Sequence, residues 1–501
     1  MSAYKKIKLE ISLKKNNLVT ESPSVKSVMF YILGLAILQL GLTGCKKFVE
    51  VDPPNVSLNG GNVYTTDATA IAAVTAIYTR SGDAAGVVLP NNIQAVSVTT
   101  ALSADELTLI SGMGGVYRGL YTNDLVATDP ANIWDQYYTL IYLANSSIEG
   151  LSQSTTLSSF VKQQLLGESK FMRAFLYFYL VNLYGDIPLA VSTDYKLNSL
   201  MPRTSASQVW QQIIADLLDA KDLMNSKYVG ADLISSSVST ERVRPNKWVA
   251  TALLARAYLY IGDYLKAEAQ ATEIINNATL FSLSTLNNAF LKNPAIDKEA
   301  IWQIQTISSG WNTNDGRVFI LPGTGPSTSY PVYLNKRLVN SFENNDNRRS
   351  NWISGIKVGT DSFFYAYKYK SATNNAPVTE YNIVFRLAEQ YLIRAEAKAQ
   401  QGNIVGAQSD LDSIRNRAGL PNTTAATKDN LLNSIFDERR HELFTEWGHR
   451  WLDLKRTNKA DAVMGVETPL KGGTWQSTDK LYPVSTSELL INPNLEQTPG
   501  Y

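Results

Sequence analysis

Histidine and cysteine are almost missing from this chain of 501 residues, which contains two His and one Cys. A lone cysteine, Cys45, excludes an intramolecular disulfide framework. The two histidines, His441 and His449, are eight residues apart, whereas a helical zinc-protease motif needs a spacing of four, and position 445 is Thr. The chain also has no Gly-x-Ser-x-Gly elbow, no phosphate-binding loop and no Cys–His pair. No common catalytic or metal-binding motif is therefore present.

The chain also lacks a long apolar run and an excess of charge of one sign. Residues 27–42 are apolar but too short for a comfortable transmembrane helix. The net charge is +1, and residues 1–44 hold six Lys against two Glu, so the remainder is slightly acidic and does not favour nucleic acid. Hydrophobic residues make up 44% and charged residues 18%, which is the balance of a soluble globular protein.

The apolar segment 27–42 has the length of the central part of a signal peptide, and it follows Lys26. It ends in Leu-Thr-Gly-Cys at positions 42–45, which resembles a bacterial lipobox, where a cysteine thiol receives diacylglycerol. We therefore predict that residues 1–44 are a signal peptide with a long leader, that Cys45 is lipidated, and that residues 45–55 form a flexible tether. The alternative is a buried free cysteine after an ordinary apolar helix.

Helical patterns dominate the rest of the chain. Apolar residues recur at spacings of three and four, which predicts amphipathic helices over residues 67–80, 132–151, 158–185 and 205–224.

Two further segments, 246–276 and 387–420, share one plan of helix, tight turn and helix. Gly262 can end the first helix in the left-handed conformation and Asp263 can cap the second, and Gly402 and Asn403 occupy the same places in the later segment. Small residues on both helices favour the close packing of tetratricopeptide repeats.

Residues 279–381 differ from the helical segments, because they are rich in Gly, Asn, Ser and Thr with scattered aromatic residues. This composition predicts an irregular insertion of loops and short strands. In an extended segment over residues 362–370, side chains alternate, so Phe363, Tyr365, Tyr367 and Tyr369 share one face. Packing of this face onto the helices is favoured over an exposed platform for a ligand.

Two polar features could be read as catalytic but have structural interpretations. Asp105 and Glu106 are the best candidates for a glycosidase acid pair, but adjacent side chains point in different directions. In residues 437–456, Arg439 with Glu442 and Glu446 with Arg450 have spacings that suit ion pairs along one helix. We predict a packed, salt-bridged helix within a C-terminal helix and tail, 428–501, and we do not expect an enzyme.

Several motifs occur in an order that resembles one family over essentially the whole mature chain. They are the lipobox, YGDIPL at 184–189, ALLARAYLYIGDYLKAEAQA at 252–271, RLAEQYLIRAEAKAQQGN at 386–403, IFDERRHELFTEWGHRWLDLKR at 435–456 and the tail at 481–501. Together they resemble the SusD/RagB family of nutrient-binding outer-membrane lipoproteins of Bacteroidetes.

This resemblance implies a mainly α fold over residues 56–501, with about four tetratricopeptide-like helical pairs as a scaffold and an irregular insertion that carries the ligand site. It implies lipid anchoring in the outer membrane, facing the cell exterior, and a partner, a SusC-type TonB-dependent transporter. The expected ligand is an oligosaccharide that the protein delivers to this transporter. Peptide uptake on the same scaffold and a purely protein-binding helical scaffold are the alternatives. No cofactor is predicted, although a structural calcium ion could support the loops.

In members of this family, the ligand site lies in loops before the second helical region and in the irregular insertion. Sugar rings have apolar faces that lie against Trp or Tyr, while amide and guanidinium groups bind the hydroxyls. A few such contacts would give micromolar to millimolar affinity, roughly 4 to 8 kcal/mol. The candidate ligand-binding residues are Tyr117, Arg118, Trp311, Asn312, Arg317 and Tyr330.

Overall fold

The computed structural model describes Met29 and residues 62–82, 95–131, 133–235, 241–292, 295, 297–306 and 310–501. Cys45 lies outside the described residues, as does the predicted signal peptide except for Met29, and so does the predicted tether. Within the described part of the chain, every helix is too short or too polar to span a membrane. Residues 60–501 form one unit, which is described below.

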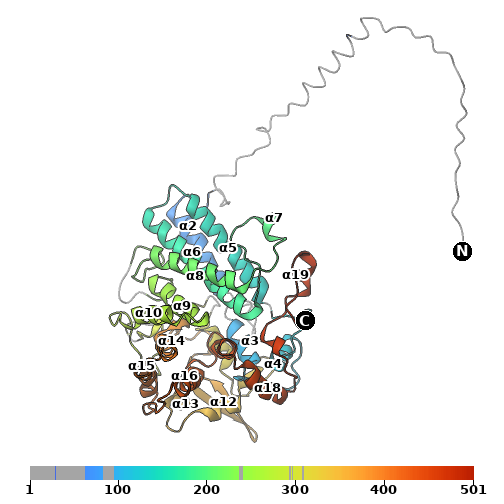
Figure 1. Cartoon of the computed structure of the whole chain (residues 1–501), viewed down its shortest axis with the longest axis vertical. Coiled ribbons are helices and arrows are strands. Elements are labelled where there is room, and N and C mark those ends of the chain that lie inside the picture. The colour runs from blue at the N-terminus through green and yellow to red at the C-terminus, as the bar shows by residue number, and fades with distance from the viewer. Residues whose placement is uncertain are drawn as a thin grey trace, which may run out of the picture. The chain divides into compact units, whose positions relative to one another are not determined.

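Helices make up most of this unit, as the sequence predicts (Figure 1). Those before the insertion are α2 (Asp67–Gly82), α3 (Ala95–Ser103), α4 (Gly115–Thr122), α5 (Ile133–Gln153), α6 (Ser159–Tyr184), α7 (Tyr195–Asn198), α8 (Ala206–Leu223), α9 (Lys247–Tyr260) and α10 (Tyr264–Ile275). The four amphipathic segments are therefore confirmed as α2, α5, α6 and α8, each within two residues of its predicted ends.

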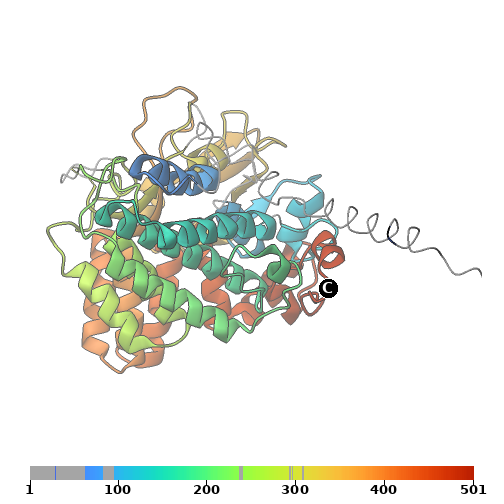
Figure 2. The same ribbon diagram turned by 90° about the horizontal axis from the view of Figure 1, so that it is seen from above.

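The insertion and the C-terminal region contain the remaining helices. They are α11 (Asn314–Phe319), α12 (Lys336–Ser341), α13 (Asn347–Asn351), α14 (Leu387–Gln400), α15 (Ile404–Arg417), α16 (Lys428–Leu443), α17 (His449–Arg456), α18 (Ala460–Leu470), the 3-10 helix η2 (Ser477–Lys480) and α19 (Thr486–Ile491). Figure 2 shows the green to orange helices towards one side and the yellow strands of the insertion towards the other.

The helical pairs α9/α10 and α14/α15 have the predicted turn chemistry. Gly262 has a φ of +79° and Gly402 a φ of +83°, a conformation that glycine adopts without steric cost. The Asp263 carboxylate accepts the backbone N–H of Lys266, and the Asn403 side chain accepts that of Gly406, so each second helix is capped. The shared plan is confirmed.

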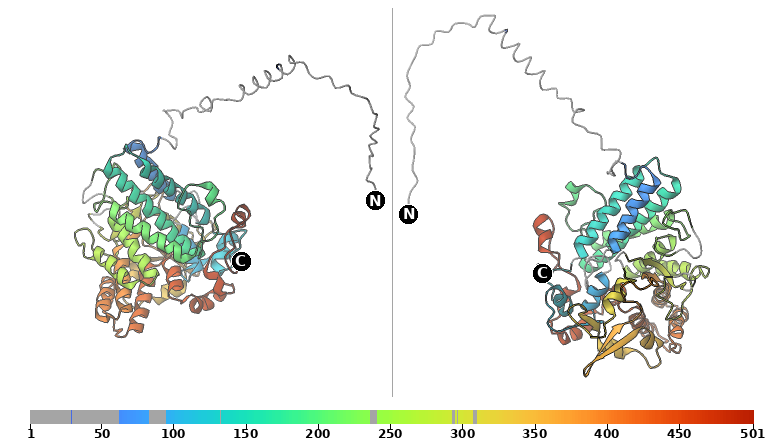
Figure 3. Two further views of the ribbon diagram at one scale, coloured as in Figure 1. Left: turned by 45° about the horizontal axis from the view of Figure 1, so that its top comes forward. Right: turned by 180° about the vertical axis from the view of Figure 1, so that it is seen from behind.

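Among the described residues, the strands form three separate antiparallel pairs. They are β1 (Leu107–Leu109) with β3 (Val332–Leu334), β2 (Ala300–Ile304) with β6 (Asn382–Arg386), and β4 (Ile353–Val358) with β5 (Asp361–Ala366). The predicted insertion of loops and short strands is thus observed. The β4–β5 hairpin projects at the lower edge of the right-hand view in Figure 3.

The core is built around α6, most of which is buried. Phe175 of α6 meets Trp302 of β2 and Trp447 edge to face, with ring centroids 5.4 and 5.8 Å apart. Aromatic pairs in this geometry add to the stabilisation from buried area. Aromatic residues of the insertion and of the C-terminal region therefore share one core with the first helices.

The prediction of one continuous helix across residues 437–456 is wrong. Helix α16 ends at Leu443 and α17 begins at His449. Thr445, Trp447 and Gly448, which lie between them, all have positive φ. The turn places the Trp447 indole in the core, where its N–H donates to the carbonyl of Ile383 at 2.6 Å. Burial of this ring outweighs the local strain of the left-handed residues.

The ion pairs expected from helical spacing are also wrong. Arg439 pairs with Asp453 of α17 at 2.7 Å, and Arg450 pairs with Asp105 at 2.7 Å. Glu442 binds Arg386, Arg348 and Arg417. The reason is burial, because a charge in the interior needs a close, geometrically matched partner, whereas spacing along a helix matters mainly on exposed faces.

Candidate functional site

The loop region after α3 meets the insertion at the β1–β3 pair. Thr108 lies opposite Tyr333 in this pair, and the backbone N–H of Ile110 donates to the carbonyl of Pro331 at 2.9 Å. On the other side, the N–H of Asn335 donates to the carbonyl of Glu106 at 2.8 Å. Two segments that are far apart in the sequence are therefore held together, and these are the regions in which the ligand site is expected.

Three aromatic residues gather at this junction, and we call Tyr121, Tyr333 and Phe363 the junction cluster. The rings of Tyr333 and Phe363 meet edge to face with centroids 5.1 Å apart. Tyr121 of α4 is close enough to Tyr333 that, after burial, this neighbour raises the pKa of Tyr121, which also hydrogen-bonds Thr108. All three side chains are half-buried, so part of each ring reaches solvent.

Charged side chains surround the junction cluster. Arg118 is exposed, lies beside Gly472 and is close enough to Tyr121 to oppose the rise of its pKa. Arg337 pairs with Glu467 at 2.6 Å. The cluster therefore combines apolar ring surface with guanidinium groups that can donate hydrogen bonds.

Trp311 and Arg317 form a second, smaller group on the insertion. The guanidinium of Arg317 lies 4.9 Å from the centre of the Trp311 ring, which is the geometry of a cation–π contact. Arg317 belongs to α11, whose first turn is capped by Thr313, because the hydroxyl of Thr313 accepts the N–H of Gly316 at 2.9 Å. Both side chains are half-buried. The structure thus brings together two of the predicted residues.

Asn312 is positioned differently from its neighbour Trp311. Its side chain is buried, and its amide oxygen accepts the backbone N–H groups of Thr379 and Glu380 at 2.7 and 3.1 Å. Its amide nitrogen donates to the carbonyl of Pro377 at 3.1 Å. Asn312 therefore ties the Trp311 loop to residues 377–380 and shapes the site rather than lining its surface.

Tyr117 and Arg118 are adjacent on α4, but they face different surroundings because successive helical residues are about 100° apart. Tyr117 lines a cavity of about 740 Å³ together with Asp129 and Asp135, while Arg118 lies towards Tyr121. Tyr330 is half-buried and closes a tight turn through two backbone hydrogen bonds with Ser327. The six predicted ligand-binding residues thus lie in several different environments.

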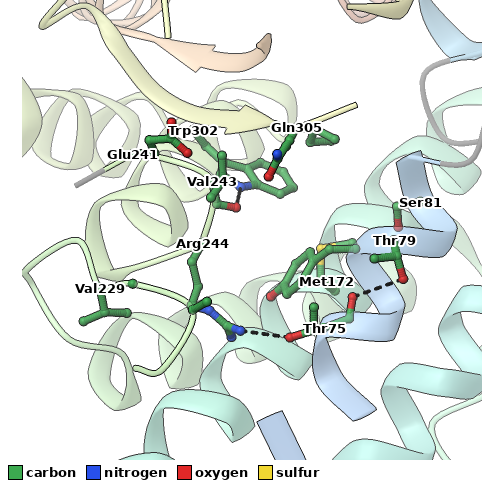
Figure 4. A pocket seen from close by; sticks show the side chains of 14 residues that line it. Thr75, Thr79, Ser81, Met172, Val229, Glu241, Val243, Arg244, Trp302 and Gln305 are labelled. Atoms are coloured by element: carbon green, nitrogen blue, oxygen red, sulfur yellow. Dashed lines mark hydrogen bonds between the residues drawn. The ribbon is translucent and has the colours of Figure 1, made fainter. Parts of the chain in front are cut away.

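A pocket of about 350 Å³ lies between α2, α6 and β2 and was not expected from the sequence (Figure 4). Its apolar wall includes Met172 and Trp302. Arg244 at its edge is neutralised by Glu168 at 2.6 Å and donates to the Thr75 hydroxyl at 3.0 Å. The pocket is assembled from four distant segments, which no local sequence pattern reveals.

Neither histidine has the setting of a metal ligand or a proton-transfer group. Burial and nearby arginines lower the pKa of His441 to about 3, and burial lowers that of His449, so both are neutral at pH 7. His441 shares a hydrogen bond with the Ser341 hydroxyl at 2.9 Å. In the described parts of the chain, His, Cys, Asp and Glu residues form no group of three that could hold a metal ion.

The carboxyl pair Asp105 and Glu106 is structural. Asp105 binds both Arg450 and Arg440, at 2.7 and 2.8 Å. Burial, together with the charge of Asp105, raises the pKa of Glu106 to about 8, so this side chain is mainly neutral at pH 7. Both are almost fully buried, and neither carboxyl group faces a space where a glycosidic bond could lie.

Comparison with known protein families gives two matches on this chain. A profile described as "SusD family" matches residues 339–501, and one described as "Starch-binding associating with outer membrane" matches residues 113–259. A SusD-like protein of Formosa agariphila is 28% identical over 422 residues, which cover 74% of this chain and 79% of that protein.

Solved structures share the fold. A SusD superfamily protein of Bacteroides vulgatus has a TM-score of 0.74 at 18% identity, covering 87% of this chain and 100% of that chain. Surface glycan-binding protein A of Bacteroides uniformis has a TM-score of 0.71 at 20% identity, covering 86% and 99%. At these identities the likeness concerns the fold alone.

Proposed function

Because this chain belongs to the SusD/RagB family, we propose that it captures oligosaccharides at the cell surface and delivers them to a SusC-type TonB-dependent transporter. It is a binding protein and not an enzyme. In this proposal, diacylglycerol on Cys45 anchors it in the outer membrane and the folded unit faces the cell exterior.

The observation that carries the proposal is the junction cluster. Sugar rings present apolar C–H faces, and the half-buried rings of Tyr121, Tyr333 and Phe363 offer matching surfaces at a place where two segments converge. Each contact of this kind contributes about 1 kcal/mol. Arg118 supplies hydrogen-bond donors for hydroxyl groups, and its exposure leaves it able to move onto a ligand.

In this proposal, Trp311, Arg317 and Tyr330 of the insertion and Tyr117 of α4 also contact the ligand. Arg317 holds the Trp311 ring by its cation–π contact and so limits the conformational freedom that a ligand would otherwise have to remove. Asn312 has the supporting role of fixing the loop that carries this ring.

The comparisons support a glycan as the ligand class. The description of one matching profile includes starch binding, and one structure of the same fold is that of a surface glycan-binding protein. A glycan also agrees with the aromatic and guanidinium groups of the site.

The proposal is tested by titrating the purified protein with separate panels of neutral oligosaccharides, acidic oligosaccharides and peptides, with Trp fluorescence as the signal. We expect micromolar to millimolar binding of at least one oligosaccharide. Binding of peptides alone would support the peptide alternative, and binding of neither class would support a protein-binding scaffold. Co-purification of a TonB-dependent transporter with the protein, extracted from its native membrane, tests the partner.

A further inference from the structure

Helix α5 carries a stripe of three aromatic residues, Trp134, Tyr138 and Tyr142, at a spacing of four. This spacing puts the side chains on one face of the helix. The rings of Trp134 and Tyr138 are 4.9 Å apart, and Tyr138 is held by a hydrogen bond from its hydroxyl to the carbonyl of Pro188 at 2.7 Å. Trp134 is only 5% exposed, whereas Tyr142 is 52% exposed. The stripe therefore leads from the core to the surface.

A cavity of about 240 Å³ lies along this stripe. Its other walls come from the segment 188–199, which includes α7, and from the C-terminal segment 488–495, which includes the end of α19. Figure 1 shows α7 and α19 beside α5, on the same side of the unit. The C-terminal wall is fixed, because the side chains of Asn492 and Asn494 donate to the carbonyls of Met201 and Leu200 at 2.8 Å each.

The polar groups of this cavity include two hydrogen-bond acceptors, from Asn198 and Glu488. The amide nitrogen of Asn198 donates to the carbonyl of Ser192 at 2.8 Å, and this bond sets the orientation of the amide. The amide oxygen of Asn198 is shielded from solvent and has no partner among the described residues. Glu488, beside Trp134, contributes a carboxyl group to the same lining.

We propose that this cavity is a second carbohydrate site, separate from the junction cluster, which binds one ring of a neutral sugar. The ring stacks on Tyr142, and its hydroxyls donate to the amide oxygen of Asn198 and to the carboxylate of Glu488. The volume, below the usual range of about 300–1,000 Å³ for drug-sized ligands, suits a single sugar ring or a chain end. The ligand class rests on the proposed function, but the two sites share no residues.

The acceptors decide between a sugar and an apolar protein side chain. The exposed apolar residue Ile491 lines the cavity and could contact either. An apolar group inside the cavity would leave the Asn198 amide oxygen unpaired and would remove water from the Glu488 carboxyl group, which is bonded to the Trp134 side chain, at a cost of about 1–3 kcal/mol for each group. Sugar hydroxyls satisfy these acceptors, so a hydroxyl-bearing ligand is favoured.

The charges favour a neutral sugar over an acidic one. The Glu488 carboxyl group is near that of Asp135, and neither would tolerate a further carboxylate or sulfate. The Arg203 guanidinium lies near Tyr138, but its donors are directed to the carbonyls of Tyr184 and Glu496 and to the Thr498 hydroxyl.

The test is a calorimetric titration of the purified protein with maltohexaose, cellohexaose, mannohexaose and laminarihexaose, and with a hexagalacturonate as the acidic probe. We expect two binding sites for at least one neutral probe. Tyr142→Ala should remove one site and leave the other, while Tyr333→Ala should affect the other. Tyr142→Phe is the matched control and should retain both, because the ring remains. Tyr195→Ala changes an exposed tyrosine of α7 outside the cavity lining and should also retain both.

Glu488→Gln tests the site in a second way, through the relative affinities for neutral and acidic probes, which a purely structural residue would not change. It replaces a charged carboxylate with two acceptor oxygens by a neutral amide with one, so neutral-probe affinity at the Tyr142 site should fall several-fold while exclusion of hexagalacturonate should relax. If one site is found, and Tyr333→Ala removes it while Tyr142→Ala has no effect, the second site is contradicted and the proposed function stands. If no probe binds the wild-type protein, both are contradicted.

Discussion

Arg386, the last residue of β6, and Glu442 of α16 form a fully buried ion pair with 2.5 Å between Nη1 and Oε1. Glu442 also binds Arg348 of α13 at 3.0 Å and Arg417 of α15. These contacts lower the pKa of Glu442 well below its usual value despite burial. One carboxylate therefore binds guanidinium groups from strand β6 and from the two helices α13 and α15.

Replacing Glu442 by Ala should destabilise the fold by about 3–5 kcal/mol, because removal of one partner leaves uncompensated charges in the interior. The measurement is the free energy of unfolding from urea denaturation. Glu343→Ala is the matched control: its ion pair with Arg415 has a half-exposed carboxylate and should contribute no more than about 1 kcal/mol. Equal effects of the two substitutions would contradict this role for Glu442.

Substitution of glycine by alanine should have opposite effects on stability in the turn between α16 and α17 and within helix α18. Gly448 has a φ of +77°, and a Cβ there would lie 2.9 Å from the Thr100 hydroxyl. Gly448→Ala should therefore cost more than about 1 kcal/mol. Gly465 lies on α18 with open space around its Cβ position, so Gly465→Ala should stabilise by roughly 0.5–1 kcal/mol. Thermal unfolding of the two variants checks the signs, and a loss of stability in both would count against the argument.

Local chemistry explains which parts of this fold could be predicted. The Gly262 turn and the Asp263 cap depend only on neighbouring residues, and the structure has both. The junction cluster could not be predicted, because the β1–β3 pair brings Tyr121 beside Tyr333 from a distant segment. The alternation of side chains along the strand predicts that Phe363 lies on an aromatic face, but no local pattern identifies Tyr333 as its partner.

The ion pairs of α16 also show that local sequence does not identify contacts between distant segments. Spacing paired Arg439 with Glu442, but Arg439 binds Asp453 because the helix breaks and α17 packs against α16. The partner of a buried charge depends on tertiary packing, which helical periodicity does not encode. Asn312 is a similar case, since its role depends on a backbone segment 65 residues or more away.

Lipidation of Cys45 remains a prediction, because this residue lies outside the described part of the chain. Cys45→Ala should abolish incorporation of labelled palmitate and release the protein from membranes. Lys47→Ala is a control that leaves the lipobox cysteine in place and should remain labelled. Continued labelling of the Cys45→Ala protein would contradict the anchor.

The proposed ligand site predicts different losses for stacking and for supporting residues. Tyr333→Ala or Trp311→Ala should each weaken oligosaccharide binding by about 1 kcal/mol, or several-fold in Kd, through the loss of one ring contact. Both rings are half-buried, so either substitution could also affect stability. The free energy of unfolding is therefore measured in parallel. Unchanged affinity in the Trp311→Ala protein would remove Trp311 from the site.

Asn312→Ala should differ from Trp311→Ala. It removes the hydrogen bonds that tie the loop to residues 377–380, so we expect both lower stability and weaker binding. Stability that is lost together with affinity marks a supporting residue, whereas affinity lost alone marks a contact residue.

Asp297 predicts a pH dependence of stability. Burial, with the neighbouring Glu299, raises the pKa of this carboxyl group to about 7. Its Oδ1 accepts hydrogen bonds from the Ser284 hydroxyl and from the backbone of Glu299 at 2.7 Å each, while its buried Oδ2 has no partner within the described residues. A neutral, protonated carboxyl group fits this setting better than a carboxylate.

Because the folded state raises this pKa above the unfolded value near 3.8, the folded protein binds the proton more tightly. The contribution to stability is present below about pH 4 and is lost as the pH rises to about 7. Asp297→Asn keeps the Oδ1 acceptor and does not titrate, so the variant should gain stability relative to wild type over this range, by up to about 4 kcal/mol at about 1.4 kcal/mol per pKa unit. Urea denaturation of both proteins at pH 4, 5.5, 7 and 8 checks this, and a constant difference across the series would show that folding does not raise the pKa of Asp297.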